Sequence, residues 1–137
     1  MKSFIDSLNA CISAGVPAVA VTSHEWERVS EETEMIAESR GIQFITWDFV
    51  KGLQKYGEML AGPSDPVKVL ETIAVNNLAD CIIHFYNFNP LLKHPAVQQK
   101  LRDTLIYCKN NGITLVFTSV SGDIPPELEK EIIVLDF

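Results

Sequence analysis

The stretch "PAVAVTSHEWERVSEETEMIA", Pro17 to Ala37, leads from an apolar strand directly into an acidic helix. In many α/β proteins a glycine-rich loop at such a junction cradles a phosphate group. Here the junction is Thr22-Ser23-His24-Glu25, which contains neither glycine nor lysine. The stretch therefore predicts an α/β fold without a phosphate loop, and it raises the question of whether that loop was lost or never needed.

Strand and helix patterns alternate along the rest of the chain. Apolar runs with helices of crossover length between them pair in parallel, with helices on both faces of the sheet. The pattern predicts one domain, residues 1–137, built as a three-layer α/β/α sandwich with a five-stranded, mainly parallel sheet. Residues 50–63 hold three glycines and a proline, so we expect a loop there with at most one helical turn. The expected strands are Val16–Ser23, Ile42–Phe49, Asp80–Phe88, Ile113–Ser119 and Ile132–Phe137.

The composition excludes several classes of protein. No apolar run is long enough to span a bilayer, and Asp6 stands where a signal peptide would be apolar, so we expect a cytoplasmic protein. A net charge of −7 makes binding to nucleic acid unlikely. The three cysteines, Cys11, Cys81 and Cys108, are odd in number and widely spaced, which predicts reduced thiols in the core.

Ligands of open α/β sheets bind at the carboxyl ends of the strands, so the residues that follow each strand are the candidates. After the first strand come Ser23, His24 and Glu25, which could form a polar binding cluster. The alternative, which we favour, is that Ser23 caps the next helix and Glu25 complements its positive end. Asn87 follows the third strand, and Ser119 ends the fourth.

The sequence shows no recognisable catalytic or metal-binding motif at these positions. Asp48 could bind a ribose, but an acid just after a strand is more often a turn residue. His84 lies within a strand and is expected to be a hydrogen-bonded core residue. A triad of Ser119, His84 and Asp48 can be written down, but no nucleophile elbow supports it. We expect no catalytic residues, no metal site, and an ordinary loop over residues 119–123.

Charge is distributed unevenly. The segment Glu25–Glu38 holds six glutamates and one arginine, while Lys93, Lys100, Arg102 and Lys109 surround the fourth expected helix. Two solvated faces are the simpler interpretation. The alternative is a head-to-tail assembly in which the acidic face of one copy meets the basic face of another.

The last third of the chain resembles a known family. "NFNPLLKHPAVQQKLRD" (Asn87–Asp103) and "TLVFTSVSGDIPPELEKEIIVLDF" (Thr114–Phe137) are similar to the N-terminal half of a family of two-part AAA+ ATPases of bacteria and plastids. The likeness is most specific at Ile124–Lys130. "GVPAVAVTSHEWERV", "FITWDFVKGL" and "DPVKVLETI" fit the same family, so the resemblance covers nearly the whole chain.

This resemblance implies a RecA-like P-loop core that has lost its catalytic motifs, with strand order 5-1-4-3-2. Ser23–Glu25 would occupy the place of the phosphate loop. Asn87 would replace the metal-holding acid of a Walker B strand, and Ser119 would lie near the polar sensor position. The family continues into a complete ATPase module, so we expect the chain to be the N-terminal part of a longer protein.

The resulting hypothesis is a non-catalytic N-terminal domain that acts in subunit assembly, in partner or substrate recognition, or in regulating the ATPase module. It would need no cofactor of its own, whereas the parent ATPase would use ATP and Mg²⁺. Its partners would be other proteins or copies of itself. The alternative is a stand-alone domain that binds a nucleotide or small ligand at Ser23, His24, Asn87 and Ser119. A hydrolase is a remote third possibility.

Overall fold

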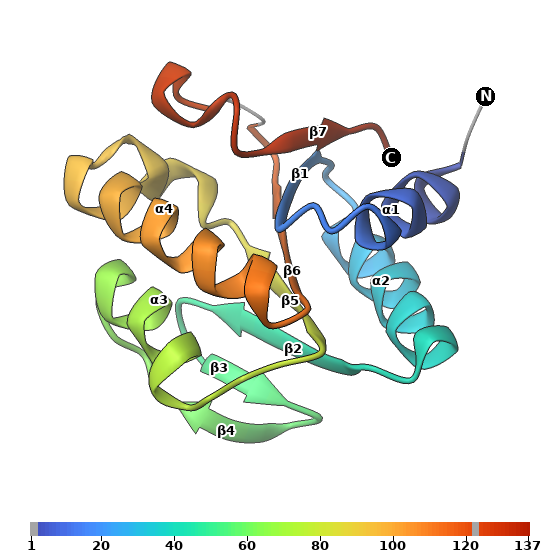
Figure 1. The fold of residues 1–137 in the computed structure, drawn as a ribbon, viewed down its shortest axis with the longest axis horizontal. Coiled ribbons are helices and arrows are strands. Elements are labelled where there is room, and N and C mark those ends of the chain that lie inside the picture. Colours follow the sequence, from blue (N-terminus) through green and yellow to red (C-terminus); the bar gives the residue numbers. More distant parts are fainter. Residues whose placement is uncertain (1–2, 122–123) are drawn as a thin grey trace.

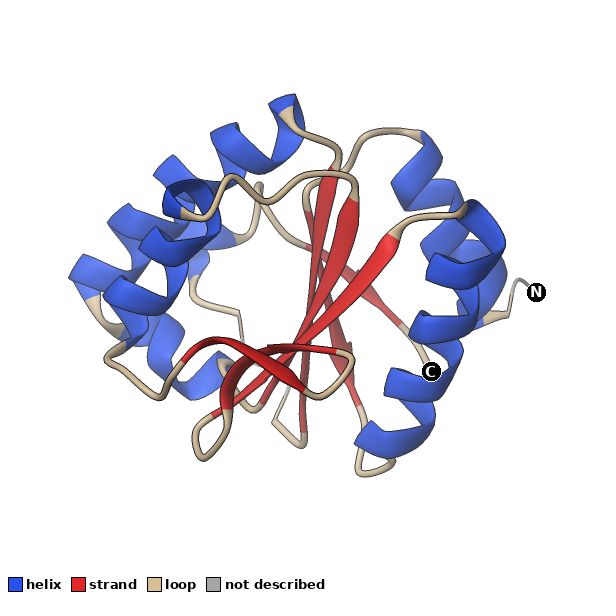
Figure 2. Cartoon of the chain, turned by 90° about the horizontal axis from the view of Figure 1, so that it is seen from below, coloured by secondary structure: helices blue, strands red, loops and turns tan. Residues whose placement is uncertain are grey.

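The computed structural model describes residues 3–121 and 124–137 and shows a twisted sheet with helices on both faces (Figures 1 and 2). Gly122 and Asp123 of the expected 119–123 loop lie outside the described residues. The elements in chain order are α1 (Phe4–Ser13), β1 (Ala18–Thr22), α2 (Trp26–Arg40), β2 (Gln43–Asp48), β3 (Gly52–Lys55), β4 (Glu58–Ala61), α3 (Pro66–Val75), β5 (Cys81–Tyr86), the 3₁₀ helix η1 (Asn89–Lys93), α4 (Pro95–Asn110), β6 (Ile113–Ser119), the 3₁₀ helix η2 (Pro126–Leu128) and β7 (Ile133–Leu135).

The sheet is mixed and has seven strands in the order β4-β3-β2-β5-β6-β1-β7. The expected five-stranded sheet and its order are therefore wrong for the sheet as a whole. The parallel part runs β2-β5-β6-β1-β7, and an antiparallel hairpin, β3-β4, extends it beyond β2. The α/β class with helices on both faces is confirmed.

Two hydrophobic cores lie on the two faces of the sheet. Successive strand residues point to opposite faces, so Val19 and Val21 of β1 belong to the core with α1 and α2, while Ala18 and Ala20 belong to the core with α3 and α4. All seven residues of β6 are buried, as parallel strands covered on both faces require. At the C-terminal end, the Phe137 ring meets the Phe4 ring edge-on at a centroid distance of 5.2 Å, which ties the end of the chain to α1.

The cysteines only partly follow the expectation of core thiols. Cys81 and Cys108 are buried, and burial raises the pKa of each thiol to about 12. Cys11 lies on α1 at the edge of a core and is only half-buried, which corrects the prediction for this residue.

The β3-β4 hairpin replaces the loop expected over residues 50–63. Lys55 pairs with Glu58 across the two-residue turn Tyr56-Gly57, whose φ angles are 50° and 83°. Positive φ at both central residues is the geometry of a type I′ hairpin turn. Gly52, at φ 72°, lies where a Cβ would approach the Ala61 carbonyl oxygen to 2.4 Å. These glycines thus serve a tight turn and a close backbone contact, not an irregular loop.

The two glycines of the hairpin predict different costs of substitution. Gly57→Ala should destabilise the chain by about 1 kcal/mol, because a Cβ there meets open space and adds only the penalty of positive φ. Gly52→Ala should cost roughly 1–3 kcal/mol more, because the added Cβ also collides with backbone. Urea unfolding of both variants measures the difference, and equal midpoints would contradict the close contact at Gly52.

Candidate functional site

Three of the five candidate residues come together at the carboxyl edge of the sheet. Ser23 follows β1, Ser119 ends β6 and Asn87 follows β5, and these strands are neighbours in the order β5-β6-β1. The Ser23 amide donates to the Ser119 carbonyl at 3.1 Å, and the Asn87 amide donates to the Thr118 carbonyl at 2.7 Å. His24 and Glu25 lie further out and are exposed.

The Ser23 side chain forms a hydrogen bond within the loop that follows β1. The Ser23 Oγ accepts a hydrogen bond from the Glu25 amide at 2.9 Å, and α2 begins at Trp26 with Glu25 as its N-cap. The prediction that Ser23 caps this helix is therefore wrong, because its hydroxyl is engaged before the helix begins. The Glu25 side chain makes no capping hydrogen bond, although its negative charge does lie at the positive end of the helix, as predicted.

The charge at the start of α2 is unfavourable for a phosphate group. Glu25 and Glu27 both lie at this end. Arg28, in the first turn of α2, lies 3.3 Å from the Glu25 carboxylate and 3.8 Å from that of Glu32. A helix N-terminus attracts anions through its free amides and its dipole, but these carboxylates already supply the negative charge and repel another.

Aromatic side chains cover the same edge of the sheet. The rings of Trp26 and Tyr86 pack at a centroid distance of 4.6 Å. With Phe49 and Val50 they form what we call the aromatic surface, in which Trp26 is 37% exposed, Phe49 50% and Val50 81%. A groove of about 410 Å³ runs along it and is lined by Trp26, Asp48, Phe49, Val50, Lys51, Tyr86 and Asn87.

Asn87 and Asp48 both have conformational roles in this groove. Asn87 is exposed at φ 59°, a left-handed conformation that asparagine tolerates better than most residues. Asp48 ends β2, and its Oδ1 accepts hydrogen bonds from the amides of Val50 and Lys51 at 2.8 and 2.7 Å. Asp48 is therefore the turn residue that its sequence position suggested.

Ser119 is poorly placed to act as a polar sensor. Its side chain is buried, and its hydroxyl donates to the carbonyl oxygen of Ser121. The only proton of this hydroxyl is therefore engaged with the backbone.

His84 is a core histidine, as predicted. It is 2% exposed, and its Nε2 lies 2.8 Å from Thr118 Oγ1 on the neighbouring strand β6. Burial lowers the pKa of His84 to about 4, because a charged imidazolium loses its hydration there. The imidazole is therefore neutral near pH 7.

The triad of Ser119, His84 and Asp48 does not form. His84 contacts Thr118, Ser119 donates to Ser121, and Asp48 holds the turn after β2. Within residues 3–121 and 124–137 there is no cluster of three or more metal-ligating side chains. None of the helices in this part of the chain is long and apolar enough to cross a membrane.

Sequence reasoning missed the aromatic surface. Trp26 lies at intervals of three and four residues from Val29, Thr33, Ile36 and Ala37, a spacing that predicts one shared buried face of α2. The other four are buried, but Trp26 lies in the first turn and remains partly exposed against Tyr86. Two sequence positions could have indicated exposed aromatic side chains, because Trp26 is the first residue of a helix and Phe49 directly follows a strand.

Comparison with known proteins supports the resemblance noted in the sequence. Residues 4–137 match the family described as "SpoVK-like AAA ATPase, N-terminal domain". No curated protein matches the chain. The family match covers all of the described residues that form the sheet and both cores.

The burial of His84 predicts a pH-dependent stability. Its pKa is about 4 in the folded chain and about 6.5 when unfolded, so the unfolded state binds more protons between these values. The free energy of unfolding should therefore fall as the pH falls from about 6.5 to 4, with His84 contributing on the order of 3 kcal/mol.

Urea unfolding at several pH values measures this contribution. The stability difference between wild type and His84→Gln should shrink as the pH falls through that window, since other titrating groups cancel. His94→Gln, which alters an exposed histidine at the start of α4, should keep the wild-type dependence. Parallel curves for wild type and His84→Gln would show that His84 does not titrate differently on folding.

Proposed function

The chain belongs to the family of SpoVK-like AAA ATPase N-terminal domains, and we propose that it is a non-catalytic domain that contacts protein through its aromatic surface. In this proposal the fold is a P-loop-like core without a working phosphate loop. ATP and Mg²⁺ are the substrate and cofactor of the ATPase module of the parent protein, and this domain acts in assembling that ATPase.

The start of α2 is the observation that carries this proposal. A phosphate site needs free backbone amides and positive charge at this point. Here Ser23 engages the Glu25 amide, Glu25 and Glu27 add negative charge, and Arg28 pairs with carboxylates of its own helix. Each of these features opposes phosphate binding.

The aromatic surface supports contact with protein. Exposed apolar groups gathered at one place are typical of interaction sites, and aromatic residues are enriched in the cores of interfaces. The rings of Trp26 and Tyr86 pack against each other at an interplanar angle of 37°, while Phe49 and Val50 extend from the β2–β3 turn beside them. We place the contact between this surface and another part of the assembled ATPase.

The alternative function is binding of a nucleotide or another small ligand at the same edge. The groove of about 410 Å³ favours it, because this volume lies within the range of small-molecule sites. Asn87 lines the groove, and Ser23 lies at the same carboxyl edge of the sheet, so these two positions test the alternative.

Calorimetric titration with ATP and Mg²⁺, and then with ADP, tests whether a phosphate site persists. We expect no binding heat at nucleotide concentrations on the order of 1 mM, because the carboxylates at the start of α2 repel phosphate. Magnesium-dependent binding at micromolar nucleotide would overturn the proposal. Weakening of such binding by Ser23→Ala or Asn87→Ala would establish the alternative.

The aromatic surface is tested in the full-length ATPase by sedimentation velocity in the presence of ATP. The double variant Trp26→Ala, Phe49→Ala should reduce the assembled fraction, because it removes two large exposed aromatic contacts. A loss of affinity of at least about tenfold is expected for residues at the centre of an interface.

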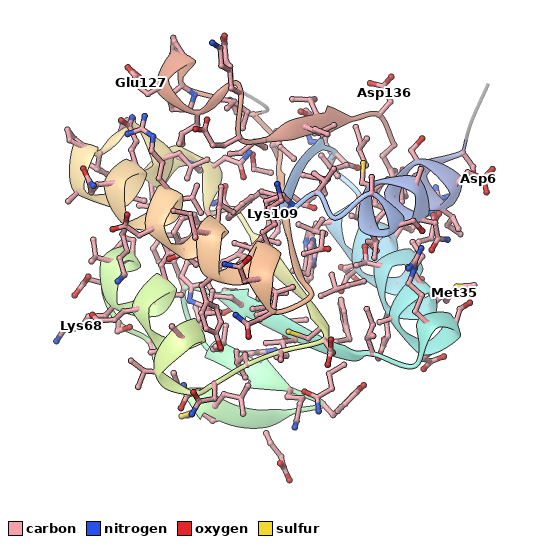
Figure 3. All side chains as sticks on the ribbon, viewed as in Figure 1. Asp6, Met35, Lys68, Lys109, Glu127 and Asp136 are labelled. Atoms are coloured by element: carbon pink, nitrogen blue, oxygen red, sulfur yellow. The ribbon has the colours of Figure 1, made fainter. Side chains whose placement is uncertain are left out.

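Met35→Ala is the matched control. Met35 is 58% exposed and projects outward from the same helix (Figure 3). It lies about two and a half turns after Trp26 and so points to the opposite side of the helix. It should leave assembly unchanged. Equal assembly of wild type and the double variant would contradict a role for this surface in assembly, whatever the outcome of the nucleotide titration.

A further inference from the structure

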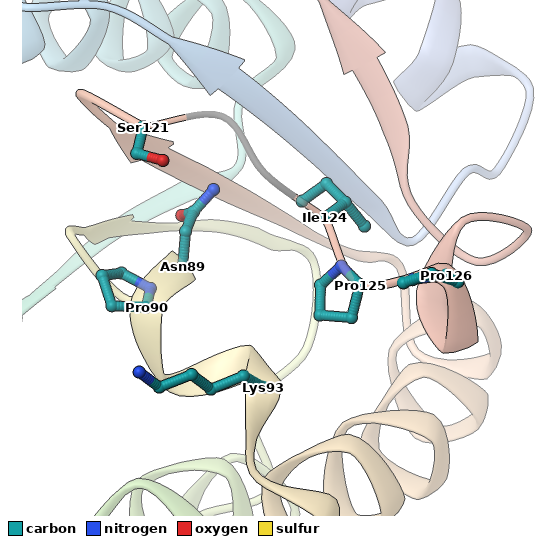
Figure 4. Close-up of a pocket in the computed structure, with 7 residues that line it drawn as sticks. All are labelled: Asn89, Pro90, Lys93, Ser121, Ile124, Pro125 and Pro126. Atoms are coloured by element: carbon teal, nitrogen blue, oxygen red, sulfur yellow. The ribbon is translucent and has the colours of Figure 1, made fainter.

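The groove along the aromatic surface brings flat aromatic rings to an exposed part of the molecule. Trp26, Phe49 and Tyr86 line it, and its volume is about 410 Å³. A second crevice, between η1 and residues 124–126, has a similar volume of about 430 Å³ but no aromatic ring among its described lining residues (Figure 4). The rings therefore distinguish the first groove as a surface on which compact apolar groups can pack face-on.

Three side chains of the same groove also carry hydrogen-bond donors. Trp26 has an indole N–H, Tyr86 a phenol O–H and Asn87 an amide NH₂, and all three residues are at least partly exposed. None of these donor groups has a hydrogen-bond partner among the residues that the structure describes. A ligand that offers carbonyl oxygens can therefore accept hydrogen bonds from them.

A segment in the polyproline II conformation matches both properties. This helix has no internal hydrogen bonds, so its carbonyl oxygens are available to a partner, and proline has no N–H that would need an acceptor in the groove. Its rings are compact and apolar, and aromatic-lined grooves are the usual recognition sites for such segments. Because the conformation exists before binding, little conformational entropy is lost on binding.

The charges at the two ends of the groove indicate which residue flanks the prolines. At the β2–β3 turn, Asp48 and Lys51 carry opposite charges that offset each other. At the start of α2, the exposed carboxylates of Glu25 and Glu27 outnumber the guanidinium group of Arg28. The α2 end therefore complements an arginine or lysine that stands beside the prolines.

We propose that the aromatic surface binds a proline-rich segment that carries a basic residue and belongs to another part of the assembled ATPase. This inference rests on the proposed function, because it names the partner of the same surface. Proline rings pack on Trp26 and Tyr86, and Asn87 donates to a carbonyl oxygen of the segment. The basic residue lies beside Glu25 and Glu27.

Titration of the ¹⁵N-labelled chain by NMR tests the site with defined peptides. N-acetyl-Arg-Pro-Pro-Leu-Pro-Pro-amide should cause saturable shifts at the Trp26 indole N–H and at the backbone amides of Phe49 and Asn87. N-acetyl-Arg-Ala-Ala-Leu-Ala-Ala-amide should bind at least about tenfold more weakly, because a flexible chain loses more conformational entropy on binding. N-acetyl-Gln-Pro-Pro-Leu-Pro-Pro-amide, which lacks the charge, should bind roughly threefold more weakly than the arginine peptide, the ratio expected for an exposed ion pair.

Conservative variants separate recognition from folding. Trp26→Phe keeps an aromatic ring and removes the N–H, so binding of the arginine peptide, followed at the Asn87 amide, should weaken about fivefold while the urea midpoint stays near that of wild type. The double variant Glu25→Gln, Glu27→Gln should abolish the preference for arginine over glutamine. Lys93→Gln, which alters an exposed lysine at the crevice of Figure 4, should change neither property.

Several outcomes would overturn the proposal. Equal affinities for the proline and alanine peptides would exclude recognition of polyproline II, and shifts centred on Lys93 in place of Trp26 would assign the peptide to the other crevice. Absence of saturable shifts with all three peptides would remove the proline-rich partner, while the assembly test of Trp26→Ala, Phe49→Ala would still decide the proposed function independently. Peptide binding together with unchanged assembly of that double variant would overturn the proposed function and, with it, the placement of the segment within the ATPase.

Discussion

The pairing of β5 with β6 at the centre of the sheet is the constraint on which the rest of the structure depends. Both strands are covered on both faces, so nearly every side chain along them must be apolar or must find a polar partner. The stacked rings of Phe85 and Phe117, 5.1 Å apart, join the two strands on one face. The His84–Thr118 hydrogen bond joins their polar side chains, and burial keeps the imidazole neutral. Polar side chains that a ligand could reach are consequently found beyond the carboxyl ends of these strands and not along them.

At that edge the molecule presents aromatic rings and carboxylates where a nucleotide-binding relative of this architecture would present glycines and a lysine. The helix dipole of α2 is complemented by its own glutamates, and the first turn of the helix packs Trp26 on Tyr86. This arrangement is unfavourable for phosphate, and it is the reason that we propose an apolar protein surface as the partner.

Most of the architecture could be predicted from the sequence because its signals are local. The Asp65-Pro66 pair is typical of a helix start, a capping side chain followed by proline, and the Asp65 carboxylate accepts a hydrogen bond from the Lys68 amide at 3.1 Å. The β3-β4 hairpin was missed because its strands are only four residues long and its glycines also fit a loop. Trp26 was assigned to the core because helical periodicity gives the face of a residue, but not whether the sheet extends far enough to cover it.

His84 and Asn89 show how differently a buried polar group can be accommodated. Each lies near the carboxyl end of the sheet and each is almost fully buried. His84 has a partner and stays uncharged, so its polarity is compatible with the core. Asn89 has the capacity for at least three hydrogen bonds and makes none with the described residues. The difference follows from position, because His84 lies within β5 beside the hydroxyl of Thr118 on β6, whereas Asn89 begins η1 beyond the end of β5.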